Sequence, residues 1–341
     1  MTTPTTTTAF YIHANGDPAA VLESGADTLP TDLQPPQVLL KILAAPVNPS
    51  DLYGVLGIYP VPLASATTAI GSKTEDVRIP GFKGVAEVAR VGSDVHGIEV
   101  GDWVIPFRSG FGTWRAHAVV DDTNVFVVRK KGELELALED AAALYINLPT
   151  AYRLLKNFVV LEKGDWSSRQ FARRQDFDAA KQSLLDLGAT AVLRDQTDDL
   201  AEYVKENVDP KCGVRLALDS VGGASLAPIV KALGDKGSAV LYSMVSGDPA
   251  PAIPVGDVIF RELKLFGFWV AQWDRDANIA DKQAVNNELV ALLHAGKIKS
   301  PAVEQVVVPS DGRAVNKDAV QRVASGLAGY RGKKDLIVFQ H

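Results

Sequence analysis

Few side chains in this sequence are of the types that bind metals or act as nucleophiles. The chain has five histidines and one cysteine, Cys212. A protein zinc site needs several such ligands close together, and these residues are too few and too scattered to supply one. Cys212 follows Lys211 in a polar stretch with no base beside it, so a nucleophilic role is not predicted. His117 and His294 are predicted to be packed or surface residues, and no metal is expected.

Length and charge exclude further classes of protein. The 341 residues, 47% of them hydrophobic, suffice for two domains at about 150 residues each. Thirty-five Lys and Arg against 41 Asp and Glu give a net charge of -6. This balance argues against nucleic acid or an anionic membrane as the main partner. No stretch approaches ~20 uninterrupted apolar residues, so no membrane span is predicted.

The amino-terminal segment carries no readable targeting signal. Residues 1–8 are polar and of low complexity, and they are predicted to form a disordered tail. No Lys or Arg occurs before Lys41, whereas Asp17 and Glu23 precede it. A mitochondrial presequence would be rich in Arg and poor in acidic residues. The residues alone therefore predict a soluble protein of the cell interior.

The first 145 residues are predicted to form a β-rich domain. Short apolar runs at 38–43, 85–89 and 103–105 are typical of strands. Turn signals at Asn48-Pro49 and Gly57-Ile58-Tyr59-Pro60 separate them. Such spacing suits a compact barrel-like domain.

The middle of the chain alternates between strand and helix patterns. A helical pattern covers 136–155. Strands are predicted at 191–193, 214–218, 239–242 and 263–269, and helices at 200–206, 226–233 and 281–295. This alternation indicates a parallel, doubly wound α/β sheet. Short strands at 303–308 and 336–339 can rejoin the first domain.

Several motifs resemble those of the medium-chain dehydrogenase/reductase superfamily. They are Ala45-Pro46-Val47-Asn48-Pro49-Ser50-Asp51, Val91-Gly92-Ser93-Asp94-Val95 and Val100-Gly101-Asp102-Trp103-Val104-Ile105-Pro106. Three more are similar to motifs of the zinc-free mitochondrial trans-2-enoyl-thioester reductases: Gly57-Ile58-Tyr59-Pro60, Gly110-Phe111-Gly112-Thr113-Trp114-Arg115 and Gly267-Phe268-Trp269-Val270. The resemblance implies a GroES-like β-barrel catalytic domain, 9–145 with 300–341, and a Rossmann-like dinucleotide domain, 146–299.

The resemblance implies NADPH-dependent reduction of trans-2-enoyl thioesters in fatty acid synthesis. Hydride reaches the β-carbon and a proton reaches the α-carbon, so the protein must align the reactants and stabilise charge on the thioester oxygen. Tyr59 matches the family tyrosine that donates or shares the proton, and a phenol stays protonated at neutral pH. Trp114 and Asn48 match family residues beside it. From the residues alone, Tyr59 can equally pack a turn bounded by proline, and Asn48 can cap a helix.

The same resemblance implies a set of NADPH-binding positions. They are Asn147, Arg173, Arg174, Tyr242, Ser243, Met244, Phe268, Trp269, Val270 and Lys334. Arg173 and Arg174 resemble the pair that binds the 2′-phosphate, for which arginine's bidentate hydrogen bonds are suited. A solvated basic run is the alternative. Where the family has Tyr-Gly-Gly-Met, this chain has Tyr242-Ser243-Met244, which is one residue shorter and lacks both glycines.

One structural unit that the family has is missing from this sequence. The family places a strand, a Gly-rich turn and a helix before its 2′-phosphate arginines, and such a βαβ unit takes about 30 residues. Here Lys163-Gly164-Asp165-Trp166 is followed by six residues, none of them glycine, and then Arg173. The neighbouring strands are expected to lose ladder partners, and the cofactor most of its pyrophosphate contacts. A skipped exon or an altered gene model is one hypothesis for this gap.

Three functions remain open. The first is the enoyl-thioester reductase, acting on trans-2-enoyl-CoA or enoyl-ACP. The second is a reductase of small enones or quinones, and the third is a non-catalytic isoform crippled by the missing phosphate-binding loop. The resemblance also implies a homodimer joined through sheet edges of the dinucleotide domain. It implies the mitochondrial matrix as well, although no presequence is readable and a cytoplasmic location is compatible with the residues.

Overall fold

The computed structural model describes residues 6–70, 73–108, 110–169, 177–194, 197–208, 213–248, 250–327 and 333–341. Contacts between residues divide the chain into two compact units. Unit 1 comprises Met1–Pro149, Trp273–Ala328 and Lys333–His341, and unit 2 comprises Thr150–Gln272 and Gly329–Gly332. The expected boundaries put 273–299 in the dinucleotide domain, whereas in the structure these residues group with unit 1.

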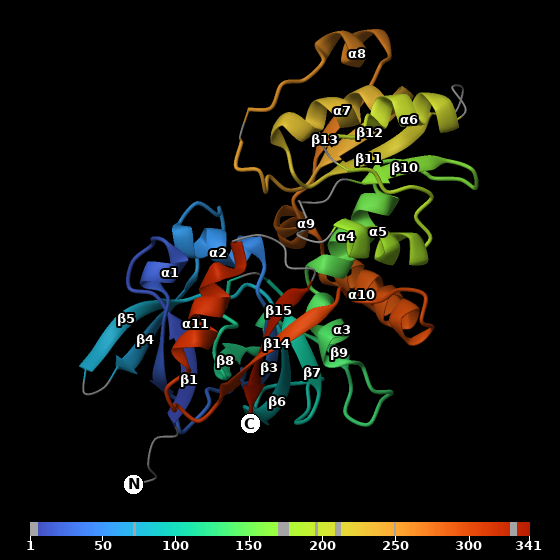
Figure 1. Cartoon of the computed structure of the whole chain (residues 1–341). Coiled ribbons are helices and arrows are strands. Elements are labelled where there is room, and N and C mark those ends of the chain that lie inside the picture. The colour runs from blue at the N-terminus through green and yellow to red at the C-terminus, as the bar shows by residue number, and fades with distance from the viewer. Residues whose placement is uncertain are drawn as a thin grey trace. The chain divides into compact units, whose positions relative to one another are not determined.

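A seven-stranded sheet forms the centre of unit 1 (Figure 1). Its strands are β3 (Gln37–Pro46), β6 (Val85–Val91), β7 (Trp103–Pro106), β8 (His117–Asp121), β9 (Val125–Arg129), β14 (Val303–Pro309) and β15 (Lys334–Gln340). Their order is β14-β15-β3-β6-β7-β9, with β8 also paired to β3. β15 pairs antiparallel with β3, with Leu336 opposite Pro46. The last strand of the chain therefore lies against the motif that begins at Ala45.

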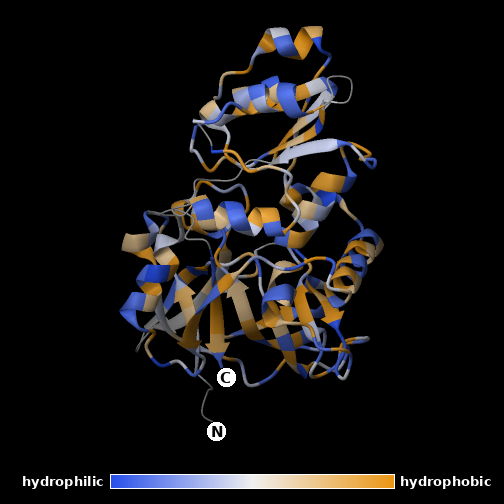
Figure 2. Cartoon of the chain, turned by 45° about the vertical axis from the view of Figure 1, so that its right-hand side comes forward, coloured by the Kyte–Doolittle hydropathy of each residue, from blue (hydrophilic) through white to orange (hydrophobic). Residues whose placement is uncertain are grey.

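Alternating burial along these strands builds the core of unit 1. In β3, Leu40, Ile42 and Ala44 are buried, while Lys41 and Leu43 between them are half-buried. This period of two is what a pleated strand imposes on its side chains. Figure 2 shows the hydrophobic residues concentrated on the strands of this sheet.

Two hairpins complete the strands of unit 1. β1 (Thr6–Tyr11) pairs with β2 (Glu23–Thr28), and β4 (Ala64–Ile70) pairs with β5 (Lys73–Ile79). The expected disordered tail, 1–8, is wrong for its last three residues, because Thr6–Thr8 belong to β1. Thr7 and Thr8 are fully buried, and Thr7 Oγ1 lies 2.8 Å from His117 Nδ1. Threonine is β-branched and favours strands, so a polar composition did not prevent order here.

The helices of unit 1 connect and flank its strands. They are α1 (Pro18–Val21), α2 (Pro49–Leu56), η1 (Asp122–Asn124), α3 (Leu138–Ala143), α10 (Ile279–His294), α11 (Lys317–Ala324) and η3 (Ser325–Leu327); α4 (Asn147–Lys156) and α9 (Val270–Asp276) carry residues of both units. The single helical pattern predicted over 136–155 is two helices. Pro149 explains the break, because proline is tolerated only in the first turn, so α4 must begin just before it.

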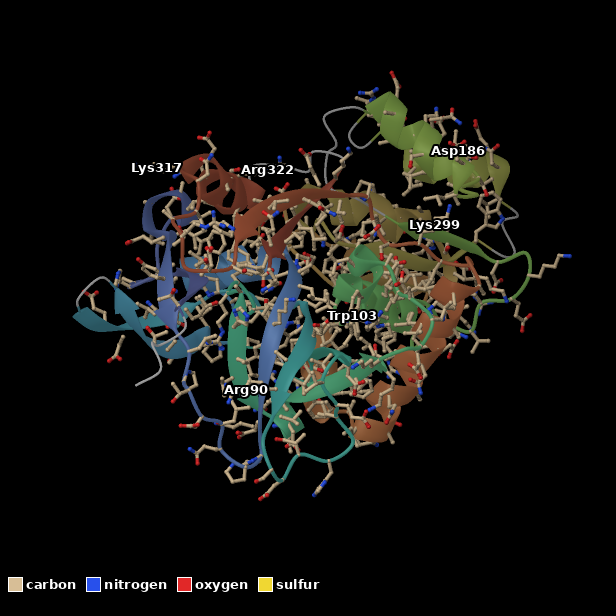
Figure 3. The ribbon with its side chains drawn as sticks, turned by 90° about the horizontal axis from the view of Figure 1, so that it is seen from below. Arg90, Trp103, Asp186, Lys299, Lys317 and Arg322 are labelled. Carbon is tan, nitrogen blue, oxygen red and sulfur yellow. The ribbon has the colours of Figure 1, made fainter. Side chains whose placement is uncertain are left out.

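An ion-pair network fastens α11 to the sheet. Arg322, labelled in Figure 3, lies 2.7 Å from Asp335 of β15 and 2.8 Å from Glu304 of β14. These two carboxylates raise the pKa of Arg322, so it stays charged at any physiological pH. The contact holds the region in which β15 begins, next to Lys334.

Unit 2 is built on a parallel four-stranded sheet. Its strands are β10 (Trp166–Arg169), β11 (Val214–Asp219), β12 (Leu233–Leu241) and β13 (Lys264–Gly267), in the order β10-β11-β12-β13. The predicted strand at 191–193 is wrong, since these residues form neither strand nor helix. β10 was not predicted, because Trp-Ser-Ser-Arg has no alternating apolar pattern. It pairs with β11, so the expected loss of a ladder partner does not occur at β11, which is paired on both sides.

Helices cover both faces of this sheet. Those of unit 2 are α5 (Phe177–Asp186), α6 (Leu200–Asn207), η2 (Gly223–Ser225), α7 (Leu226–Ala232) and α8 (Val255–Phe260). α7 packs on one face, where Ala217 and Ala239 lie. On the opposite face, Leu154 of α4 and Phe158 pack against Leu216. The doubly wound arrangement predicted from the alternating pattern is present.

Candidate active site

Tyr59 stands directly after the end of helix α2. Gly57 ends the helix with φ of +82°, a conformation that glycine adopts without strain. The next two backbone N–H groups, of Ile58 and Tyr59, both donate to the carbonyl of Tyr53, at 3.0 and 3.2 Å. The half-buried Tyr59 ring packs on Phe82, with ring centroids 5.2 Å apart. Hydrogen bonds to Tyr53 therefore fix the backbone at Tyr59, and Phe82 supports one side of the Tyr59 ring.

The first turn of the same helix contains Asn48 and Asp51. Asn48 precedes the helix, as the helix-cap interpretation expected, and is only 3% exposed. Asp51 is fully buried and accepts hydrogen bonds from the backbone N–H groups of Asn48, at 2.8 Å, and Phe82, at 2.7 Å. Nδ2 of Asn48 has no hydrogen-bond partner among the described residues. A buried donor without an acceptor is costly, so this group is suited to meet a ligand oxygen.

Lys334, which is close to the carboxyl terminus in the sequence, lies beside the start of the same helix. Its Nζ donates to Oδ1 of Asn48 at 2.5 Å. Burial lowers the pKa of Lys334 to about 8, and the carboxylate of Asp51 opposes that shift. Lys334 and Asn147, two of the predicted cofactor residues, line one small pocket in unit 1, together with Pro46 and Glu139.

Trp114 lies in the core and not on a surface of unit 1. Its side chain is fully buried and meets Phe10 edge to face, with ring centroids 6.3 Å apart. Nε1 of Trp114 has no hydrogen-bond partner among the described residues. The structure thus gives Trp114 a packing position behind Gly81, the neighbour of Phe82, and no exposed face toward a ligand.

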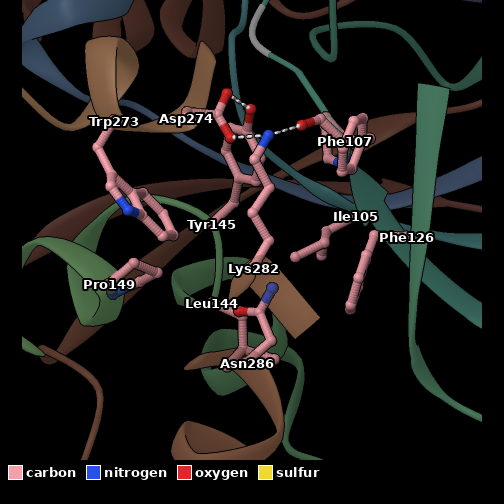
Figure 4. Close-up of a pocket in the computed structure, with 11 residues that line it drawn as sticks. Ile105, Phe107, Phe126, Leu144, Tyr145, Pro149, Trp273, Asp274, Lys282 and Asn286 are labelled. Carbon is pink, nitrogen blue, oxygen red and sulfur yellow. Dashed lines mark hydrogen bonds and ion pairs between the residues drawn. The ribbon is translucent and has the colours of Figure 1, made fainter. Parts of the chain in front are cut away.

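Unit 1 also contains a buried charged cluster (Figure 4). Nζ of Lys282 lies 2.8 Å from Asp274 and donates to the carbonyl of Phe107 at 3.0 Å. The hydroxyl of Tyr145 donates to the same carboxylate, and Nζ of Lys83 stands 3.4 Å from the centroid of the Tyr145 ring. Burial lowers the pKa of Lys83 to about 7, and Asp274 and Asp51 oppose this. No motif indicates these residues, because their spacing in the sequence has no period.

The predicted cofactor residues of unit 2 lie at one edge of its sheet. Tyr242, Ser243 and Met244 follow β12, and Phe268, Trp269 and Val270 follow β13. The carboxyl ends of adjacent parallel strands are the usual ligand position in doubly wound folds. Phe268 packs edge to face against Phe158, at 5.9 Å between centroids. Arg173 and Arg174 lie outside the described residues.

The loops at this edge are tied to one another. The carboxylate of Asp219, at the end of β11, accepts from the backbone N–H groups of Val221 and Gly222 at 2.8 and 3.0 Å. Tyr242 donates its backbone N–H to the carbonyl of Asp219 at 3.0 Å, and Ser246 donates to Val221 at 2.9 Å. These bonds fix the loop after β12 against the loop after β11.

The histidines do not gather into a metal site in the part of the chain that the structure describes. No group of three or more His, Cys, Asp or Glu side chains is placed there to hold a metal ion. His117 packs against His341, 4.9 Å between ring centroids, and burial lowers the pKa of His117 to about 4. His294 ends α10 at the surface, and Cys212 lies outside the described residues. Among the described helices, none has both the length and the apolar character to cross a membrane.

Known proteins match both units. The alcohol dehydrogenase GroES-like domain family matches residues 34–130, and the zinc-binding dehydrogenase family matches 176–285. The mitochondrial enoyl-[acyl-carrier-protein] reductase of Caenorhabditis elegans is 33% identical over 292 residues, 78% of each chain. That of Homo sapiens is 31% identical over 330 residues, 89% of this chain and 83% of the relative. This chain belongs to the enoyl-[acyl-carrier-protein] reductase family.

Solved structures of the enoyl reductase family agree with this assignment. The mitochondrial 2-enoyl thioester reductase heterodimer from Candida tropicalis has a TM-score of 0.84 and 28% identity, over 98% of this chain and 99% of its own. A mutant of Etr1p in complex with NADP and crotonyl-CoA has the same TM-score and identity. A quinone oxidoreductase of Pseudomonas syringae, 20% identical with a TM-score of 0.75, shares the fold. The predicted GroES-like and Rossmann-like architecture of the medium-chain dehydrogenase/reductase superfamily is confirmed, and by family the chain is an oxidoreductase.

Proposed function

We propose that this chain reduces trans-2-enoyl thioesters with NADPH. The substrate is an acyl-CoA or an acyl carrier protein conjugate in fatty acid synthesis. The observation that carries the proposal is the placement of Tyr59, a phenol fixed by backbone bonds to Tyr53 and by the ring of Phe82. The family membership and a solved relative that holds NADP and crotonyl-CoA support it.

The chain's own residues have separate tasks in this reaction. When bound, the nicotinamide supplies hydride for the β-carbon. Tyr59 holds its proton at the phenol oxygen for the α-carbon, as general acid. Asn48 Nδ2, buried without a described partner, and the amine of Lys334 are donors suited to an oxygen that gains negative charge. Asn147 and the residues after β12 and β13 orient the dinucleotide.

The fit for the cofactor is incomplete at the pyrophosphate. The residues that follow Trp166 contain no glycine before Gly188, so no Gly-rich turn can bring backbone N–H groups close to phosphate. We propose that the first strand–loop–helix unit of the family is shortened here and that NADPH binds far more weakly than in an intact relative. Arg173 and Arg174 remain the proposed 2′-phosphate residues. A non-catalytic isoform is the second candidate function, and this glycine-free segment favours it.

A homodimer is proposed through unit 2. β13 is one of the two edge strands of the described parallel sheet, and an edge strand presents unpaired backbone groups to a second copy. Helix α8 exposes Phe260 to 87% and Ile259 to 61%. The relative from Candida tropicalis is a heterodimer, and the mitochondrial relatives support the mitochondrial matrix as the proposed compartment.

Turnover and binding measured side by side test these proposals. We expect NADPH oxidation with a trans-2-enoyl thioester, together with a small thermal shift on adding NADPH. Turnover that does not depend on acyl-chain length would favour a reductase of small enones or quinones. Calorimetry that shows micromolar binding of NADPH would refute the weak-binding proposal. A folded chain without turnover at saturating NADPH would establish the non-catalytic isoform.

A further inference from the structure

Asp51 joins two segments that are distant in the sequence. Its side chain is fully buried. Oδ2 accepts from the backbone N–H of Asn48 at 2.8 Å, and Oδ1 accepts from the backbone N–H of Phe82 at 2.7 Å, 31 positions away. Hydrogen bonds to a charged acceptor are shorter and stronger than those between neutral groups. The start of α2 is thereby fixed to the segment that carries Phe82.

Both of these segments hold Tyr59. Its backbone is bound to the carbonyl of Tyr53 in α2, and its ring packs on Phe82 at a tilt of 39°. A shift between α2 and the Phe82 segment would therefore turn or withdraw the phenol. A displacement of about 1 Å at a reacting group can lower a rate by two orders of magnitude.

We propose that Asp51 is a positioning residue that sets the orientation of the Tyr59 phenol for proton transfer to the substrate. This inference rests on the proposed function, in which Tyr59 is the acid. Asp51 acts through the backbone of Asn48 and Phe82 and touches neither reactant.

Burial raises the pKa of the Asp51 carboxyl, and the hydrogen bonds from the backbone N–H groups of Phe82 and Asn48 and the charge of Lys83 oppose that shift. In its charged form, Asp51 also acts on two buried amines. Lys83 faces Asp51 from the Phe82 segment, and Lys334 faces it from β15. The carboxylate raises the pKa of each amine against the lowering effect of burial. Lys83 faces Asp274 and Lys282 as well, with Tyr145 beneath its amine. Removing the charge of Asp51 should therefore lower the pKa values of Lys83 and Lys334.

Asp51→Asn is the variant that isolates this role. An asparagine keeps the shape but offers one acceptor, so one backbone N–H faces an NH₂ group. Asp102→Asn is a matched control in the same unit: Asp102 is 1% exposed and accepts from the backbone N–H groups of Glu99 and Lys131 at 3.0 Å each. None of the described bonds of Asp102 leads to Tyr59.

Steady-state kinetics with NADPH and crotonyl-CoA separate positioning from general stability. We expect Asp51→Asn to lower kcat at least ten-fold while both KM values stay within two-fold, and Asp102→Asn to keep kcat within two-fold. The alkaline limb of the kcat–pH profile should move to lower pH in Asp51→Asn alone. An equal loss of kcat in both variants, or a full kcat and unmoved profile in Asp51→Asn, would overturn the proposal.

The Tyr59→Phe background distinguishes this proposal from the proposed function. If Tyr59→Phe loses turnover, adding Asp51→Asn should change kcat less than two-fold further, because both changes remove one function. If Tyr59→Phe keeps full turnover, the proposed role of Tyr59 fails. If Tyr59→Phe loses turnover but Asp51→Asn keeps full kcat, the proposed role of Tyr59 stands and only the positioning role of Asp51 fails.

Amide hydrogen exchange tests the same link without turnover. We expect the amides of Ile58, Tyr59 and Phe82 to exchange at least ten-fold faster in Asp51→Asn than in the parent, and at the parent rate in Asp102→Asn. Unchanged exchange in Asp51→Asn overturns the positioning role. If Asp51→Asn does not fold, Phe82→Leu is the second variant, because it removes the aromatic ring that supports Tyr59. A full kcat in Phe82→Leu would then overturn the positioning role.

Discussion

The amine of Lys334 donates a hydrogen bond of 2.5 Å to Oδ1 of Asn48, although 286 positions separate the two residues. The bond connects the first residue of β15 with the residue that precedes α2. It also orients the Asn48 amide, so that Nδ2 is left to meet another acceptor. A residue predicted to bind the cofactor, Lys334, and one predicted to be catalytic, Asn48, are thus directly hydrogen-bonded.

This bond predicts non-additive kinetics. Asn48→Ala and Lys334→Met should each lower kcat/KM for crotonyl-CoA by about ten-fold, as expected for the loss of one hydrogen bond that involves a charged group. The double variant should lose far less than the product of the two effects. The measurement is a double-mutant cycle at pH 7, where Lys334 is charged because its pKa is about 8. Fully multiplicative losses would show that the two side chains act independently.

Removal of one hydroxyl tests the acid. Tyr59→Phe should lower kcat by about 100-fold, since a positioned general acid contributes 10²–10⁴-fold, and should leave NADPH affinity nearly unchanged. Tyr53→Phe, which removes a hydroxyl from α2 but keeps the backbone carbonyl that accepts the N–H of Tyr59, is the control and should retain kcat. Steady-state kinetics and calorimetry give the two quantities. Joint loss of turnover and NADPH affinity in Tyr59→Phe would indicate a packing role.

Burial of Lys83 predicts how stability depends on pH. Its pKa is about 7 in the folded chain against 10.5 for a free lysine, so the unfolded chain binds more protons between these values. The contribution of Lys83 to the free energy of unfolding therefore rises with pH through this window. Lys83→Met should be more stable than the parent at pH 6, by roughly 1–2 kcal/mol, and this advantage should shrink toward pH 10.

Urea denaturation at several pH values measures this difference. The exposed Lys163, changed to methionine, is the control, and its difference from the parent should stay constant with pH. A pH-independent difference for Lys83→Met would mean that the amine stays charged in the folded chain.

Close packing around Gly81 predicts that adding a side chain at this position strongly destabilises the fold. Its φ is +92°, and a Cβ there would lie 2.4 Å from Cδ1 of Trp114. Gly97 has φ of +77° with nothing within 4 Å, so Gly97→Ala carries the backbone strain alone. Gly81→Ala should lower the free energy of unfolding by about 2 kcal/mol more than Gly97→Ala, because overpacking typically costs 1–3 kcal/mol. Similar denaturation midpoints for the two variants would show that Trp114 can move aside.

Much of the fold follows from local patterns in the sequence. Apolar runs at 38–43 and 214–218 lie within β3 and β11, and the pattern at 281–295 matches α10 within two residues. Segments with mixed signals failed: 191–193 is apolar but forms no strand, and Trp166–Arg169 forms one without an apolar pattern. For Trp166–Arg169, pairing with β11 determines the strand conformation, and the neighbouring residues in the sequence contain no information on that partner strand.

The candidate site, like the fold, could be predicted from the sequence only in part. Motifs around Asn48, Tyr59 and Phe268 were enough to indicate the family and its chemistry, because these residues are fixed by short-range order along the chain. Asp51 belongs to the same motif as Asn48, but its contact with Phe82 could not be found in this way, and neither could the buried cluster of Lys83, Asp274 and Lys282. The contacts of Asp51 with Phe82 and of Lys282 with Phe107 each join segments that are distant in the sequence.

The sequence by itself therefore determined the family, the two-domain architecture and the identity of the candidate acid, Tyr59. Only the tertiary structure decided what holds that acid, which carboxylates face the buried lysines, and that Trp114 is a core residue. The physical reason is that periodicity and turn chemistry act over a few residues, whereas burial and charge pairing depend on which distant segments meet.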